Sequence, residues 1–120
     1  QKTVVPVDEL AHCIRESLTY LTQYGAVCTL HQEGKGSVRS CDAQNAYDFF
    51  EDCLEAALPS LSALMVRVEC GERFSIRLMM EDAAGLPNVD KYRTLGKLTI
   101  DDADGELCAT LSFDRGGECA

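Results

Sequence analysis

The sequence is short of histidine, of basic residues and of long apolar runs. Only two histidines occur and no cysteine pair has Cys-x-x-Cys spacing, so the clustered ligands of a zinc site are missing despite seven cysteines. Eleven Lys and Arg stand against 20 acidic residues, and the net charge of −9 argues against nucleic-acid binding. No stretch approaches the roughly 20 apolar residues of a membrane span, so we expect no membrane contact by this domain.

What is present indicates a globular domain. The 120 residues, 46% of them hydrophobic, fit a single domain over residues 1–120 with a real core. The chain begins at Gln rather than Met, so we interpret it as a fragment of a longer protein, which could carry a membrane anchor upstream. Most cysteines fall in periodic apolar segments, where Cys behaves as a small hydrophobe. This pattern favours reduced thiols and a cytoplasmic location.

Two segments have the period of an amphipathic helix. Residues 7–25 form the first, with Pro6 and Asp8 suited to its start and Gly25 suited to a C-terminal cap. Its apolar stripe is Leu10, Ile14, Leu18 and Leu21. Residues 43–58 form the second, with Asp42 as the predicted N-cap and Pro59 ending it. Its stripe is Ala46, Phe49, Phe50, Cys53, Leu54, Ala57 and Leu58.

Alternating apolar residues predict six strands. They cover residues 26–32, 37–40, 63–70, 73–81, 94–102 and 107–114. The strands over 63–70 and 73–81 form the clearest hairpin, and the last two form a second one across residues 103–106. A loop over 82–93 separates the two hairpins. The order α β β α β β loop β β predicts a two-layer α/β sandwich of the α+β class, with a mixed, mostly antiparallel sheet and both helices on one face.

This order of elements, together with two short motifs, resembles the ATP-binding domain of bacterial sensor histidine kinases. Those domains belong to the gyrase, heat-shock, histidine-kinase and mismatch-repair (GHKL) ATPases and have the Bergerat fold. In the first family motif, a Glu and an Asn-Ala pair lie on the second helix, and the Asn oxygen binds Mg²⁺. In "EDCLEAALPSLSALMVRVE", Glu51 matches the Glu and Ala56 the Ala. Glu55 replaces the Asn and becomes the predicted Mg²⁺ ligand, whereas Leu58 and Pro59 replace a basic residue and a His.

The second family motif reads Asp-x-Gly-x-Gly and follows the first hairpin. Its Asp accepts a hydrogen bond from the adenine amino group, and its glycines let the backbone approach the base. In "MEDAAGLP", Glu81 falls at the Asp position, Ala83 at the first Gly and Gly85 at the second. We therefore predict a vestigial nucleotide site made by Glu51, Glu55, Glu81, Ala83 and Gly85.

The third family feature, a long lid with a Gly-rich phosphate-binding segment, is missing. Only "LPNVDKYR" separates Gly85 from Thr94, and Lys91 and Arg93 are its sole basic residues. The resemblance therefore implies a Bergerat-like domain with a shortened lid and no catalytic residues of its own. We expect a degenerate ATPase-like C-terminal domain of a sensor histidine kinase, acting in two-component signal transduction as a regulatory or interaction module. Its partners would be its own dimerisation helices or a response regulator.

An alternative stays open. The domain could be a shortened but functional catalytic domain that binds ATP and Mg²⁺ and phosphorylates a His on an upstream helix. Outside this site, His12 and Glu16 are spaced as an i, i+4 pair, which is more often surface decoration. A nucleophile made of Cys13 or Cys28 with a histidine, His12 or His31, is not supported by spacing. The apolar face of "FFEDCLEAAL" is more simply the core under the sheet than a partner-binding face.

Overall fold

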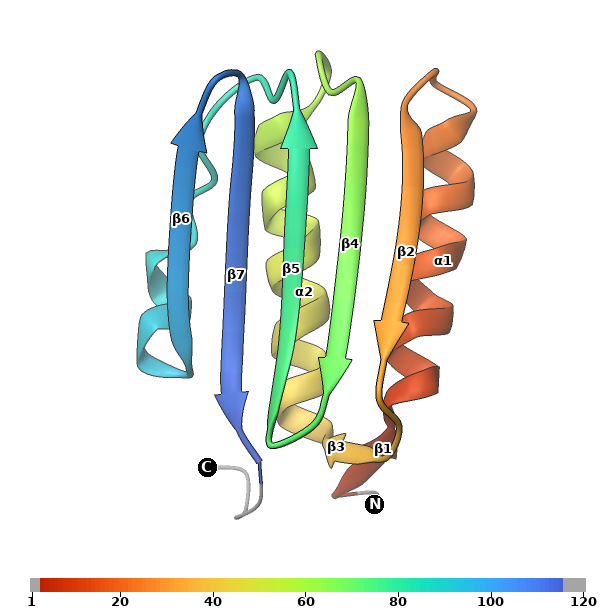
Figure 1. Ribbon diagram of the computed structural model, residues 1–120, viewed down its shortest axis with the longest axis vertical. Coiled ribbons are helices and arrows are strands. Elements are labelled where there is room, and N and C mark those ends of the chain that lie inside the picture. Colours follow the sequence, from red (N-terminus) through yellow and green to blue (C-terminus); the bar gives the residue numbers. More distant parts are fainter. Residues whose placement is uncertain (1–2, 116–120) are drawn as a thin grey trace.

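The computed structural model describes residues 3–115, in which a five-stranded sheet is covered on one face by two helices (Figure 1). The strands are β2 (Val27–Glu33), β4 (Ala63–Cys70), β5 (Arg73–Glu81), β6 (Lys97–Ala103) and β7 (Glu106–Asp114). Their order is β2-β4-β5-β7-β6; β2 is parallel to β4, and the other pairs are antiparallel. The predicted two-layer sandwich with a mixed, mostly antiparallel sheet is confirmed.

Helices α1 (Val7–Thr22) and α2 (Ser40–Ala57) run in the same direction across the sheet (Figure 1). The predicted stripe of α1 is buried throughout, because its spacing of three and four residues follows one side of the helix. The predicted stripe of α2 is also buried, which makes this face part of the core. The prediction is wrong only for Leu58, which lies just beyond the helix end and is 39% exposed.

Pro6 is the N-cap of α1 and Pro59 follows the end of α2, as predicted, but two other predicted caps, Asp42 and Gly25, are not the observed ones. Helix α2 begins at Ser40 with Arg39 as its N-cap, so the prediction of Asp42 as the cap is wrong. Asp42 lies in the first turn, 5% exposed, where its two carboxylate oxygens accept hydrogen bonds of 2.8 and 3.0 Å from the Arg39 guanidinium. A paired carboxylate at this place also complements the positive end of the helix dipole. At the end of α1 the cap is Gln23, and Gly25, with φ 93°, completes the following turn instead.

Two short strands tie the starts of the helices together. β1 (Val4–Pro6), which the sequence pattern did not predict, pairs antiparallel with β3 (Ser37–Arg39) in a separate two-stranded sheet. Each strand leads directly into a helix, β1 into α1 and β3 into α2. Both helices therefore start at the same end of the molecule (Figure 1).

The two predicted hairpins are present. In β4 and β5 the alternating apolar residues face the helices and are fully buried, as predicted. The turn between β6 and β7 is tighter than predicted, because Asp104 and Gly105 both have positive φ, 54° and 79°, as in a two-residue hairpin turn. Residues 94–96 precede β6 rather than belonging to it. The 3₁₀ helix η1 (Asp90–Thr94), which was not predicted, spans the end of the predicted loop and Thr94.

Cysteine chemistry agrees only in part with the expectation of reduced thiols. Five cysteines are free, namely Cys13, Cys28, Cys53, Cys70 and Cys108. Cys41 is disulfide-bonded, and Cys119 lies outside the described residues. Burial, helped by the charge of Asp52, raises the pKa of the Cys53 thiol to about 12, so this cysteine behaves as a core hydrophobe. Within residues 3–115, neither helix has the length and apolar character needed to cross a membrane.

Candidate functional site

The predicted site residues lie around the C-terminal half of α2 and the loop over residues 82–96. Glu51 and Glu55 are exposed on α2, one helical turn apart. Glu81 ends β5 with its side chain exposed, and its backbone carbonyl accepts a 3.0 Å hydrogen bond from the backbone N–H of Ser62. Ala83 is partly buried against the core, whereas Gly85 is exposed.

The start of the loop is fixed to the end of α2. The N–H of Ala84 donates a 2.9 Å hydrogen bond to the carbonyl of Ala57, one of the carbonyls that a helix C-terminus leaves without an intrahelical partner. Asp82 adopts a positive φ of 59° and accepts a 2.6 Å hydrogen bond from the Ser62 hydroxyl at its carboxylate. The Ser60 hydroxyl donates to the Asp82 carbonyl at 2.6 Å. These contacts hold the second motif region against the first.

The rest of the loop packs on the side of α2 that carries Phe49 and Asp52. Val89 and Tyr92 are only 1% and 2% exposed, so both belong to the core. The Tyr92 ring meets Phe49 edge-on, with ring centres 5.5 Å apart. Its hydroxyl donates a 2.6 Å hydrogen bond to Oδ2 of Asp52. Burial, followed by this hydrogen bond, raises the pKa of the Tyr92 phenol, so the group stays protonated at neutral pH.

Sequence reasoning missed both Asp52 and Tyr92. Lys91 was noted only as a basic residue in the loop; its Nζ lies 3.2 Å from Oδ2 of Asp52 and 5.3 Å from the centre of the Tyr92 ring. Arg93 pairs with Asp90 at 3.2 Å and donates to the Leu98 carbonyl at 3.3 Å. The loop also contains Leu86 and Leu95, which are exposed, so the sequence alone did not show that Val89 and Tyr92 are the side chains that pack.

Two separate shallow cavities flank the packed loop. One, of about 300 Å³, is lined by Asn45, Asp48, Glu51, Asp52, Lys91, Tyr92 and Leu95. The other, of about 380 Å³, is lined by Asp82, Ala83, Ala84, Gly85, Leu86, Asp102, Gly105 and Leu107. Glu51 belongs to the first cavity, Ala83 and Gly85 belong to the second, and Glu55 and Glu81 line neither. The five predicted residues are therefore not brought together around one cavity.

The charges near the first cavity are unfavourable for phosphate. Asp48, Glu51 and Asp52 face one Lys there, and Lys91 is already paired with Asp52. Across the described part of the chain, no group of three or more His, Cys, Asp or Glu side chains is arranged to hold a metal ion. A protein usually binds Mg²⁺ through one or two carboxylates together with substrate phosphates. Glu55 as a Mg²⁺ ligand stays a prediction.

The remaining candidate functional residues are either exposed on the helix surface or too far from each other to act together. His12 Nε2 is 3.4 Å from Glu16 Oε1, but the two side chains are 73% and 70% exposed. This is an ordinary surface pair, which contributes little to stability. Cys28 and His31 lie on opposite faces of β2, because successive strand residues alternate, so they do not form a nucleophile pair. Partial burial raises the pKa of the Cys28 thiol, which makes it less reactive.

Comparison with known proteins supports the fold. No family model and no curated protein sequence matches this chain. The structure is similar to the catalytic domain of histidine kinase ThkA, with a TM-score of 0.65 and 8% identity over 96% of each chain. Acinetobacter baumannii histidine kinase AdeS aligns over 95% of this chain and 67% of its own, at 10% identity and a TM-score of 0.65.

The histidine kinase domain of the E. coli osmosensor EnvZ aligns over all of this chain and 94% of its own, at 9% identity and a TM-score of 0.60. At such low identity the likeness concerns the path of the backbone and not the chemistry of the site. The chain therefore has the fold seen in these histidine kinase domains, as its order of elements implied.

Proposed function

We propose that this protein is a degenerate ATPase-like domain of a bacterial sensor histidine kinase, which binds little or no ATP. It acts in cytoplasmic signal transduction as a regulatory or interaction module, with its own dimerisation helices or a response regulator as partners. The closeness of its fold to histidine kinase catalytic domains supports the signalling context.

One observation carries the loss of ATP binding. The loop over residues 82–96 packs onto α2 beside the predicted site, with Val89 and Tyr92 as part of the core. Glu51 lines one shallow cavity, Ala83 and Gly85 line another, and the other two predicted residues line neither. The acidic side chains of α2 also repel phosphate. A nucleotide at this place would have to displace the loop. Val89 and Tyr92 would then become exposed to water, which costs free energy.

The direct test is a titration with Mg²⁺-ATP at millimolar concentration, followed by thermal unfolding and by calorimetry. We expect no shift of Tm relative to Mg²⁺ alone. A nucleotide present at 100 times its Kd adds about 2.7 kcal/mol to the stability of the folded state. For a domain of this size that gain corresponds to a rise of Tm by roughly 10 °C. A rise of this kind would overturn the proposal.

Two variants test whether ATP binding is limited by the side chains of the site or by the packed loop. Glu55→Asn with Ala83→Gly restores the family residues at two positions, and Glu16→Asn on α1 is the control for a lost charge. We expect the double variant to remain without measurable binding, because Val89 and Tyr92 still pack on α2. Binding gained by the double variant and not by the control would show that the site is a relic limited by its side chains.

The alternative is a functional catalytic domain that binds ATP and phosphorylates a His supplied by an upstream helix. The description of its structural neighbours as catalytic domains favours this function. It requires saturable Mg²⁺-ATP binding in the titration above, and then phosphate transfer within the longer protein.

A further inference from the structure

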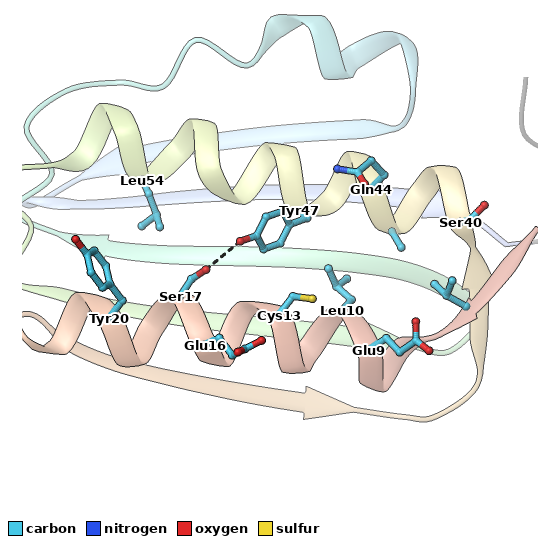
Figure 2. Close-up of a pocket in the computed structure, with 12 residues that line it drawn as sticks. Glu9, Leu10, Cys13, Glu16, Ser17, Tyr20, Ser40, Gln44, Tyr47 and Leu54 are labelled. Atoms are coloured by element: carbon cyan, nitrogen blue, oxygen red, sulfur yellow. Dashed lines mark hydrogen bonds between the residues drawn. The ribbon is translucent and has the colours of Figure 1, made fainter. Parts of the chain in front are cut away.

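A groove runs between α1 and α2 on the outer side of the helix layer (Figure 2). Its volume is about 910 Å³, more than twice that of either cavity beside the loop. Leu10 and Leu54, only 5% and 9% exposed, form apolar parts of its lining, and Cys13 and Ala43 line it as well. The Ser17 and Tyr47 hydroxyls form a 3.0 Å hydrogen bond across it (Figure 2). We call this surface the helix groove.

The length of the helix groove suits a helix. Along α1 its lining extends from Glu9 to Tyr20, which is about 16 Å at the 1.5 Å rise of an α-helix. That distance corresponds to about three turns of a docked helix lying along α1 and α2. Helices commonly bind in such apolar grooves through side chains spaced three and four residues apart.

The charge around the helix groove is almost entirely negative. Helices α1 and α2 carry eight acidic residues, of which Glu9 and Glu16 line the groove; Asp48, Glu51 and Asp52 line the cavity beside the loop instead, and Asp42 is buried against Arg39. Their only Lys or Arg is Arg15, although the chain has 11 such residues. Within residues 3–115, the charged side chains that line the groove are those of Glu9 and Glu16, and no Lys or Arg is among them. An occupant with basic residues beside its apolar ones is therefore complementary to this surface.

Aromatic side chains extend the apolar surface at one end of the helix groove. Tyr20 and Tyr24 are 58% and 70% exposed, and their rings meet edge-on with centres 5.3 Å apart. Their hydroxyls form a 2.9 Å hydrogen bond, which holds the two rings together. Tyrosines are over-represented among the residues that contribute most to protein interfaces. This end of the groove is thus suited to anchor a partner.

We propose that the helix groove docks an amphipathic helix of a partner protein, whose apolar stripe is flanked by Lys and Arg. The inference rests on the proposed interaction role and names the chemistry of the partner. A second copy of the domain fits less well, because a symmetric contact would place the acidic rims of two copies against each other. Nucleic acid and anionic membranes are repelled by the same charges.

The test uses an 18-residue helical peptide with a Leu stripe flanked by Lys, and a matched peptide with Glu at each Lys position. Each is titrated into the ¹⁵N-labelled domain, and amide shifts are followed by NMR. We expect the Lys peptide to shift the amides of α1 and α2 with saturation, and the Glu peptide to cause no saturable shift. Equal shifts with both peptides, or shifts confined to the open face of the sheet, would overturn the proposal.

Matched charge variants separate the groove from overall charge. Glu9→Lys with Glu16→Lys reverses two charges in the groove, and Asp101→Lys with Asp102→Lys makes the same change on β6. We expect the first to raise the peptide Kd roughly tenfold, because two exposed ion pairs are lost, and the second to change it far less. An equal loss in both would mean that only net charge attracts the peptide, and the groove would not be its site.

A steric variant gives a readout without a charge change. Cys13→Trp fills the helix groove from an exposed position and should abolish saturable binding, whereas Thr99→Trp on β6 should leave it unchanged. A control without peptide tests for self-association. If the amide shifts of groove residues change with protein concentration, and sedimentation shows dimers, the occupant is a second copy and the proposal is overturned. No nucleotide takes part, so the outcome is independent of the ATP titration.

Discussion

The two flanks of α2 differ in what covers them. On one flank, the loop over residues 82–96 lies against the helix, and Tyr92 is packed on Phe49 and hydrogen-bonded to Asp52. On the other flank, α1 leaves the 910 Å³ helix groove, with Ser17 and Tyr47 joined across it. The resemblance to histidine kinases directed attention to the first flank, yet the protein covers that flank with its own chain. The second flank has no motif, and residues 3–115 leave it open.

The difference shows what a motif position can and cannot indicate. Glu51 and Glu55 occupy the motif positions on α2, but what surrounds them depends on a loop too short to form a lid. Because this loop contains the buried Val89 and Tyr92, it acts as part of the core rather than as a gate. The open groove, by contrast, follows from the spacing of two helices, which no local sequence pattern specifies. The predictions below test each flank in turn.

The largest expected effect comes from removing the aromatic cover. Tyr92→Ala should lower the free energy of unfolding by about 3–5 kcal/mol, because a buried aromatic ring is lost and a cavity remains. Tyr24→Ala is the matched control; this side chain is 70% exposed, so its loss should cost less than about 0.5 kcal/mol. Urea unfolding at pH 7 measures both. A cost below about 1 kcal/mol for Tyr92→Ala would mean that the loop does not close this flank.

A smaller change removes only the hydroxyl. Tyr92→Phe keeps the ring but leaves the carboxylate of Asp52 without this donor, so unfolding should become easier by about 1.5–3 kcal/mol. The lower end is expected, because Lys91 and solvent still reach Asp52, which is 29% exposed. An unchanged stability would show that the hydrogen bond contributes nothing to the cover.

The same variant changes the dependence of stability on pH. The pKa values of Tyr92 and Cys53 are both raised in the folded state, for Cys53 to about 12. The pKa values in the unfolded chain are near 9 for Cys and 10 for Tyr. The contribution of these two groups to the free energy of unfolding is therefore fully present below those pH values and is lost as pH rises above them. Urea unfolding at pH 8, 10 and 11 should show a steep decline for the wild type and a shallower one above pH 10 for Tyr92→Phe. If the free energy of unfolding declines equally with pH in both proteins, Tyr92 does not have a raised pKa.

On the open flank, removing a tyrosine hydroxyl should lower the free energy of unfolding by less than Tyr92→Phe does. Tyr47→Phe removes the hydroxyl that bonds to Ser17, a neutral and partly buried contact, so we expect a loss of about 0.5–1.5 kcal/mol. Ser17→Ala should cost a similar amount, and the double variant little more than either single one, because all three lose one hydrogen bond. Additive losses in this cycle would show that the two hydroxyls act independently.

Much of the fold could be predicted because its information is local. The stripes of α1 and α2 and the alternation in β4, β5 and β7 follow directly from residue spacing. The short strand over residues 37–40 was predicted and is present as β3, but β1 has only three residues, too few for a pattern, and its pairing with β3 depends on contacts distant in sequence. The cap of α2 was missed because Asp42 pairs with the Arg39 guanidinium instead of capping the helix.

Less of the candidate site could be predicted. The motif positions of Glu51 and Glu81 can be found from the order of elements, but their distance from each other and from a cavity cannot. The packing of Tyr92 on Phe49 joins residues 43 positions apart and depends on the path of the whole loop. The helix groove is harder still, because Leu10 and Leu54 read equally well as ordinary core positions. Sequence patterns show which side of a helix is apolar, not whether a neighbour covers it.

The smallest expected effect concerns the charge on the covered flank. Lys91 Nζ is 3.2 Å from Asp52 Oδ2, but the two side chains are 68% and 29% exposed, so Lys91→Ala should cost at most about 0.5 kcal/mol. Its position over the Tyr92 ring adds little at an exposed site. Urea unfolding at low and high salt measures the cost. A loss above about 1.5 kcal/mol that disappears at 1 M salt would mean that charge, and not burial, holds the loop.

The salt dependence then separates the two flanks. Screening shortens the range of charge interactions to about 3 Å at 1 M salt, but it leaves the burial of Val89 and Tyr92 unaffected. The cover over the first flank should therefore persist at high salt, whereas binding of a basic helix in the acidic groove should weaken. If both respond equally to salt, the contrast between a flank closed by packing and a flank open to a charged partner is wrong.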